Sequence, residues 1–206
     1  MKFSLPLLFL CFSIGISFQL SAQSYIGLSG GGGINSEVLF RTAIPAEIPI
    51  NQTLSIRSEL VYIQRENRDI LLKLNGDRNY WQPVISYLEL PILAKAHLHI
   101  NSLSIYALAG PKFGYGIKLA ANYLEDNTFY EERFHFSDEG IHQFDFGLNF
   151  GFGLEKRINK DRKIFVDYRF YLGLYDIDQA ASTSIFNQGQ VFNLGFLVPI
   201  FQQINE

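Results

Sequence analysis

Along most of the chain, large apolar residues alternate one position at a time with polar residues or glycines. The clearest example is residues 144–156, FDFGLNFGFGLEK, where Phe or Leu occupies each even position up to 154 and Asp, Gly, Asn or Glu occupies the odd positions between them. Successive side chains of a β-strand point to opposite faces. This run therefore predicts a strand with one apolar face and one face of charges and glycines.

The same alternation recurs along the sequence and predicts eight strands. Two of them are less regular, because four consecutive glycines end the first and two prolines interrupt the second. No helical periodicity of useful length follows the N-terminal segment. The predicted strands cover residues 24–33, 37–50, 54–62, 87–100, 103–121, 144–156, 164–175 and 190–201.

The links between these strands alternate in length, which carries independent information. The short links are 51–52, 101–102 and 159–161, and the long polar links are 66–84, 123–141 and 177–189. Only the first link, 34–36, departs from this alternation, because it is short at a position where a long link is expected. Short turns at one rim and long loops at the other are typical of bacterial outer-membrane barrels. The predicted fold is all-β, an eight-stranded antiparallel up-and-down transmembrane β-barrel with both termini on the periplasmic side.

A soluble β-sandwich or a lipocalin-like barrel would show the same periodicity, so the outward face must be decided on physical grounds. Glycines share the parity of the charges, which suits a crowded barrel interior better than a face in water. Opposite charges also recur on that face, as in Arg57 with Glu59 and Asp167 with Arg169. A basic residue on the lipid side would cost ~2–4 kcal/mol near the midplane.

The number of apolar side chains and the length of the strands both agree with an apolar face in lipid. Roughly forty large apolar side chains would exceed the interior of an eight-stranded barrel, although a two-sheet sandwich could hold them. Ten residues per strand, tilted by ~45°, span ~23 Å, close to the apolar band of such barrels. The side chains predicted to face lipid include Phe144, Phe146, Leu148, Phe150, Phe152, Phe170 and Phe196. The predicted polar network of the lumen comprises Arg57, Glu59, Glu89, Lys95, Lys112, Lys118, Asp145, Glu155, Asp167 and Arg169.

The first 22 residues resemble an export signal. Lys2 precedes an apolar run, and small residues near Ala22 offer a cleavage site. We therefore expect a cleaved secretory signal peptide at 1–22 and one barrel domain at 23–206. Cys11, the only cysteine, lies within the signal, so the mature chain must be stabilised by packing and backbone pairing rather than by disulfides. The net charge of −3 favours neither nucleic acid nor an acidic substrate.

Several strand segments resemble the small porin-family, PorT-like outer-membrane β-barrels. The matching segments are SELVYIQRE, YLELPILAK, YALAGPKFGYGIK, FDFGLNFGFGLE and VDYRFYLGLYDI, within residues 54–200. The Tyr-Leu-Glu-Leu-Pro and Ala-Gly-Pro elements are the most distinctive. The chain departs from the family pattern at its end, where QQINE follows Phe201. The resemblance implies the fold and an outer-membrane location.

Two sets of residues could carry chemistry. His97 and His99 share one strand face and could both bind zinc or copper. Because the sequence offers no nearby third ligand, we interpret them as ordinary polar residues at the periplasmic rim. In a long link, His135 or His142 could act with Ser137, Asp138 or Glu139 in a lipid-modifying site, although no nucleophile motif surrounds them. We predict no catalytic residue, no metal and no cofactor.

The predicted function is that of a non-catalytic, integral outer-membrane protein with a side-chain-filled lumen, serving envelope integrity, adhesion, or a secretion or transport assembly. The alternatives are a narrow porin-like channel for ions or small solutes and a lipid-modifying enzyme. The expected partners are outer-membrane lipid and the outer-membrane assembly machinery, with a protein or glycan ligand at the loops that contain residues 79–83 and 127–136. We expect a monomer.

Overall fold

The computed structural model describes residues 23–33, 38–66, 83–125, 128–159, 162–177 and 185–200. The predicted signal peptide, residues 79–82 of one candidate binding loop and Phe201 lie outside these ranges. The strands are β1 (Tyr25–Gly33), β2 (Val38–Pro49), β3 (Leu54–Glu66), β4 (Val84–Ile100), β5 (Leu103–Glu125), β6 (Thr128–Phe134), β7 (Phe144–Asn159), β8 (Arg162–Asp176) and β9 (Phe186–Pro199), and the helix is α2 (Phe136–Glu139).

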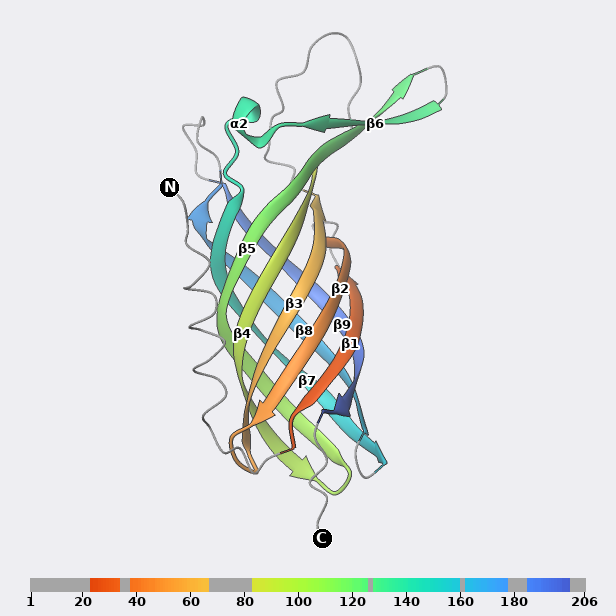
Figure 1. Ribbon diagram of the computed structural model, residues 1–206, viewed down its shortest axis with the longest axis vertical. Helices are drawn as coiled ribbons and strands as arrows, with labels where there is room; N and C mark the ends of the chain where they lie inside the picture. The colour runs from red at the N-terminus through yellow and green to blue at the C-terminus, as the bar shows by residue number, and fades with distance from the viewer. Residues whose placement is uncertain are drawn as a thin grey trace.

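Eight of the strands form a closed antiparallel ring. Its order is β4-β3-β2-β1-β9-β8-β7-β5, and an additional β4–β5 pairing closes it. The tilted strands wrap around one axis, with the short β2–β3 and β4–β5 turns and the adjoining ends of β7 and β8 at one end (Figure 1). The predicted eight-stranded up-and-down barrel is confirmed. In the described part of the chain, no helix is long and apolar enough to cross a membrane.

The predicted long link 123–141 contains regular structure that the sequence reading missed. Strand β5 continues beyond the ring and pairs with β6 from Leu119↔Phe134 to Glu125↔Thr128. Helix α2 follows, and Gly140, the C-cap residue directly after it, adopts a left-handed conformation with φ 69°. The β5–β6 extension and α2 lie together at the end opposite the short turns (Figure 1).

A β-bulge in β5 changes which side chains face inward. The register shifts where Ser86 pairs with Lys118 but Tyr87 pairs with Gly116, which leaves Ile117 as the extra residue. Leu119 therefore points inward and is 1% exposed, whereas the Lys118 side chain is 28% exposed. The prediction that Lys118 belongs to the lumen network was wrong, because strict alternation does not allow for a bulge.

Glycines on the inner face make room for neighbouring side chains. A Cβ added to Gly153 would lie 2.6 Å from the Tyr106 ring and 2.7 Å from Asp167 Cβ. A Cβ added to Gly116 would lie 2.8 Å from the Phe136 ring, which α2 supplies. Both contacts are too short for a real side chain, so these positions need the smallest residue.

The outer face of the ring is apolar. Of the seven residues predicted to face lipid, the structure places Phe144, Leu148, Phe150, Phe152 and Phe196 in exposed positions. The other two are half-buried by outward aromatic neighbours. The Phe146 ring lies 5.3 Å from that of Phe113, and the Phe170 ring lies 5.6 Å from that of Phe150.

Candidate functional site

Charged side chains lie inside the barrel as three groups of ion pairs along its axis. We name them, from the short-turn end, the floor group, the middle group and the outer group. All of their members are buried. The floor group is Glu47, Arg57, Lys95, Glu155 and Lys163; the middle group is Arg41, Glu59, Asp167 and Arg169; the outer group is Arg65, Glu89, Lys112 and Asp145.

In the floor group, two lysines bridge two carboxylates. Lys95 Nζ lies 2.8 Å from Glu47 Oε2 and 2.6 Å from Glu155 Oε2. Lys163 Nζ lies 3.1 Å from Glu47 Oε1 and 3.0 Å from Glu155 Oε1. Arg57 Nη2 approaches Glu47 Oε2 at 2.6 Å. Each carboxylate oxygen therefore has a cationic partner, as buried charges require.

The middle group is built around a forked arginine. Arg169 Nη1 and Nη2 donate to the two oxygens of Glu59, each at 2.8 Å. Arg169 Nε donates to Asp167 Oδ1 at 2.8 Å, and Arg41 also donates to Glu59. Arg57 Nη1 lies 3.6 Å from Asp167 Oδ2, which links this group to the floor group.

The outer group joins strands that are distant in sequence. Lys112 Nζ lies 2.7 Å from Asp145 Oδ2 and 3.1 Å from Glu89 Oε1. Arg65 Nη2 lies 2.8 Å from the same Glu89 oxygen, and its guanidinium carbon lies 4.5 Å from the centre of the Tyr171 ring. Removing one member of such a group would leave another charge buried without its partner.

Nine of the ten predicted lumen residues lie in these three groups; Lys118 is the exception. The sequence reading missed four members, which are Arg41, Glu47, Arg65 and Lys163. Arg65 and Lys163 lie just beyond the predicted ends of their strands, and the other two lie in the strand that prolines interrupt. Within each strand they share the parity of the other inward charges, which is the signal that could have found them.

Apolar side chains occupy much of the remaining interior in two clusters. The outer apolar cluster lies in the long-link half and includes Ile63, Ile85, Leu119 and, from α2, Phe136. The inner apolar cluster comprises Tyr25, Leu93, Tyr106, Leu108, Phe165 and Leu197. The inner cluster touches the floor group, since the Arg57 guanidinium carbon lies 4.4 Å from the centre of the Phe165 ring. Side chains therefore fill the barrel, as the small diameter of an eight-stranded ring leads one to expect.

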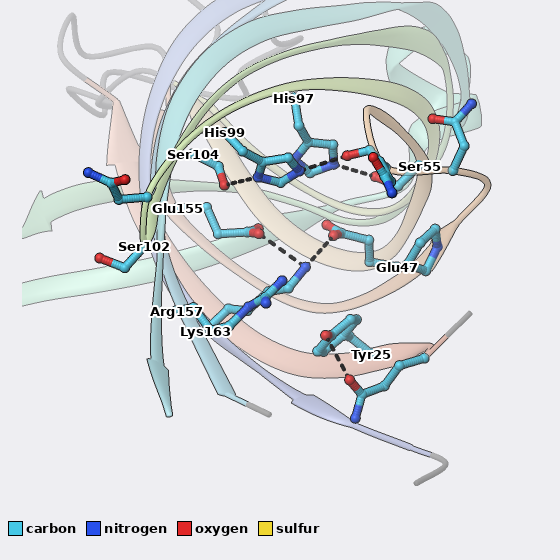
Figure 2. A pocket seen from close by; sticks show the side chains of 15 residues that line it. Tyr25, Glu47, Ser55, His97, His99, Ser102, Ser104, Glu155, Arg157 and Lys163 are labelled. Carbon is cyan, nitrogen blue, oxygen red and sulfur yellow. Dashed lines mark hydrogen bonds and ion pairs between the residues drawn. The ribbon is translucent and has the colours of Figure 1, made fainter. Parts of the chain in front are cut away.

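A cavity of about 760 Å³ opens at the short-turn end, and we call it the vestibule. Its size lies within the range of small-molecule sites. Figure 2 shows Glu47, Glu155 and Lys163 on one side of the vestibule and His97 and His99 on another. The β4–β5 turn contributes Ser102, and β7 contributes Arg157.

The two histidines considered as metal ligands line this vestibule. His97 Nε2 lies 2.8 Å from Ser55 Oγ, and His99 Nδ1 lies 2.6 Å from Ser104 Oγ. Their rings stack with centroids 5.5 Å apart. Among the described residues, no group of three or more His, Cys, Asp or Glu side chains could hold a metal ion. The imidazoles instead tie strand β4 to serines on the neighbouring strands.

The residues considered for lipid chemistry lie on and around α2. Ser137 Oγ donates a hydrogen bond to Asp138 Oδ1 at 3.1 Å, so its proton is held by an adjacent carboxylate rather than by a histidine. His135 precedes the helix without a side-chain capping hydrogen bond. The His142 ring packs against the Tyr175 ring, with centroids 5.3 Å apart. Among the described residues, Ser137 is therefore paired with a carboxylate and not with the histidine that activates many serine nucleophiles.

The β5–β6 extension carries its own exposed charges. Lys118 Nζ lies 2.5 Å from Glu131 Oε2, and Arg133 Nε lies 3.4 Å from Glu131 Oε1. The hydrogen bond from Lys118 lowers the pKa of Glu131 below its ordinary value. Tyr130 is 46% exposed on the same strand. Aromatic and charged groups are thus presented together at the end opposite the vestibule.

Comparison with known families decides what class of protein this is. The family model described as "Outer membrane protein beta-barrel domain" matches residues 12–179, which is more than half of the chain. The chain belongs to this family. It is an integral protein of the bacterial outer membrane, with the short turns, the start of β1 and the end of β9 on the periplasmic side. The vestibule of this outer-membrane barrel therefore opens toward the periplasm.

Solved outer-membrane barrels resemble the chain at low sequence identity. A major outer membrane protein from Thermus thermophilus is 13% identical, with a TM-score of 0.49 over 86% of this chain and 99% of that one. The N-terminal β-barrel domain of Pseudomonas aeruginosa OprF is 9% identical, with a TM-score of 0.46 over 86% and 96%. Ail, the attachment invasion locus protein of Yersinia pestis, is 13% identical, with a TM-score of 0.44 over 86% and 96%. No curated protein matches the sequence.

Proposed function

We propose that this outer-membrane barrel is a closed, non-catalytic scaffold that acts at the cell surface through its outer end, in adhesion or in a larger envelope assembly. The observation that carries this proposal is the filling of the lumen by three buried ion-pair groups and two apolar clusters. A barrel whose interior is filled in this way supports neighbouring segments rather than a solute path. The finer resemblance to PorT-like barrels is compatible with a place in such an assembly.

The β5–β6 extension is the part of the described chain best suited to meet a partner. It projects beyond the closed ring (Figure 1). Its Tyr130 and Arg133 side chains are exposed. Aromatic and arginine side chains are enriched where proteins bind other proteins. The partner we propose is a protein or an acidic glycan, since Arg133 is 74% exposed and could contact a carboxylate or sulfate.

Surface binding can be tested on cells that display the full chain. Tyr130→Ser together with Arg133→Ser should reduce binding to a glycan array or to immobilised matrix proteins, because both side chains belong to the proposed contact surface. Lys156→Ser together with Arg162→Ser is the matched control, since both residues are exposed at the opposite end. Equal binding by the two double variants and the parent would refute a role for the extension.

A narrow channel is the second candidate, because the vestibule opens the barrel at one end. Planar-bilayer recording of purified, folded protein distinguishes it from a closed scaffold. We expect no stable conductance steps, with folding verified by heat-dependent migration on a gel. Reproducible steps would establish the channel instead.

A lipid-modifying enzyme is a separate alternative, which lipid analysis of a deletion strain addresses. If the barrel is non-catalytic, deletion leaves the acylation of lipid A and the phospholipid composition unchanged. A product that disappears on deletion and returns with the intact gene, but not with Ser137→Ala, would make the α2 region an active site.

A further inference from the structure

The buried charges of the described chain do not balance, and the imbalance lies beside the vestibule. Seven buried cations face six buried carboxylates. The middle and outer groups each contain two cations and two carboxylates, whereas the floor group contains three cations and two carboxylates. A buried charge without a counter-charge is costly. The floor group therefore favours an additional negative charge nearby.

The two carboxylates of the floor group are already engaged. Glu47 and Glu155 each accept from Lys95 on one oxygen and from Lys163 on the other. They are also the only acidic side chains among the described residues that line the vestibule. The excess positive charge is thus left for a group that enters from the periplasm.

Hydrogen-bond donors around the vestibule are available to such a group. The exposed Arg157 side chain has no side-chain partner among the described residues, and its backbone nitrogen donates to Ser102 O at 3.0 Å. The Asn51 side-chain oxygen accepts from Thr53 N at 2.9 Å, which leaves its amide nitrogen to donate. The forked guanidinium of Arg157 matches the planar geometry of a carboxylate or phosphate.

We propose that the periplasmic vestibule is a binding site for a small oxyanion, a free phosphate or carboxylate solute. The anion lies between Arg157 at the rim and the floor group, where Lys163 forms the innermost positive contact. Ser102 and Asn51 donate the remaining hydrogen bonds from the short turns. The cavity is occupied from the periplasm alone, because side chains fill the barrel beyond the floor group.

The test uses the isotopically labelled full chain in maltoside micelles, a detergent without phosphate. Inorganic phosphate and, separately, acetate are titrated at constant ionic strength. We expect saturable shifts of the Asn51, Ser102 and Ser104 amide signals. Arg157→Gln should weaken the affinity at least about tenfold, the effect of losing one charge-assisted hydrogen bond. Arg162→Gln, which removes an exposed arginine that does not line the vestibule, should leave the affinity unchanged within about twofold.

A second variant tests the charge argument by adding a negative charge to the vestibule. Ser102→Glu places a carboxylate next to Arg157, so it should abolish phosphate binding and raise the melting temperature of the phosphate-free protein. Unsaturable shifts, equal losses in Arg157→Gln and Arg162→Gln, or full phosphate binding by Ser102→Glu would each overturn the proposal. The same shifts produced by phosphatidylglycerol in phosphate-free micelles, with no response to free phosphate, would assign the site to a lipid headgroup and also refute a free solute.

Discussion

At the scale of single residues, the barrel depends on charges that are buried in pairs and bridges rather than solvated. Arg169 illustrates this, since it contacts both Glu59 and Asp167 while fully buried. A buried ion pair adds little folding stability compared with an apolar replacement of similar size. Removing only one partner is strongly destabilising, because the other charge stays buried without a counter-charge. Period-2 alternation was enough to predict nine of these buried residues, because strand parity fixes the face. It could not identify which carboxylate each cation contacts, since the pairs join residues up to 116 positions apart.

We expect Arg169→Met to destabilise the folded barrel by about 3–5 kcal/mol, because Glu59 and Asp167 lose a shared cation. The measurement is urea unfolding in lipid vesicles, monitored by the circular dichroism of the β-strands. Lys118→Met is the matched control, since it breaks a partly exposed ion pair and should cost less than about 1 kcal/mol. Similar losses of unfolding free energy in the two variants would show that the buried ion pairs of the middle group contribute no more to stability than the partly exposed pair.

Neighbouring positions on β7 offer a test of the two faces. Leu148→Arg should block assembly into the membrane, because a cation facing lipid costs ~2–4 kcal/mol near the midplane. Asn149→Asp should be tolerated, because Asn149 is fully buried on the inward face of β7, which already carries the buried carboxylates Asp145 and Glu155. The amounts of folded protein in isolated outer membranes give the comparison. The reverse ranking would invert the assignment of inside and outside.

At the scale of elements, the ring strands were predictable and the β5–β6 extension was not. The ring strands repeat a clear apolar face, which is the signal that alternation detects. In TFYEERF, residues 128–134, Phe129 and Tyr130 are adjacent and two glutamates follow, so the alternation is broken. Strand β6 forms because its backbone pairs with the continuation of β5, a contact with no local signature in the apolar pattern. The same applies to the bulge at Ile117, which moved Lys118 out of the lumen.

The link between the extension and the barrel rim can be followed through Glu131. A carboxyl whose pKa is lowered in the folded state stabilises the fold above its unfolded pKa, and this contribution is lost as the pH falls through the folded pKa. NMR titration of the Glu131 carboxyl carbon should therefore show a midpoint below the ordinary value. Lys118→Gln should raise that midpoint, whereas Arg162→Gln at the opposite end should not. An unchanged midpoint in Lys118→Gln would mean that the two side chains do not pair in solution.

At the scale of the whole molecule, closure of the ring and filling of its lumen explain the outer-membrane location and favour a surface role over a pore. Closure leaves no unpaired strand edge within the ring, which hydrocarbon would penalise. This architecture could be predicted from the sequence for two reasons. Glycines occupy the same alternate positions as the charges, and the apolar side chains are too many for the interior of an eight-stranded barrel. The vestibule could not be predicted, because it arises where side chains from many strands meet at one end. The sequence also does not identify the partner of the outer end, because binding by surface segments depends on their three-dimensional shape.

The most direct test of this architecture is the detection of magnetisation transfer from lipid acyl chains to leucine methyl groups in the unmodified, methyl-labelled protein. The outward Leu148 and Leu194 are 39% and 63% exposed, whereas the inward Leu93 and Leu197 are both 0% exposed. We predict strong acyl-chain contacts for Leu148 and Leu194 and none for Leu93 and Leu197. Acyl-chain contacts at Leu93 and Leu197, or their absence at Leu148 and Leu194, would contradict a barrel with an apolar surface in lipid and an interior of ion pairs.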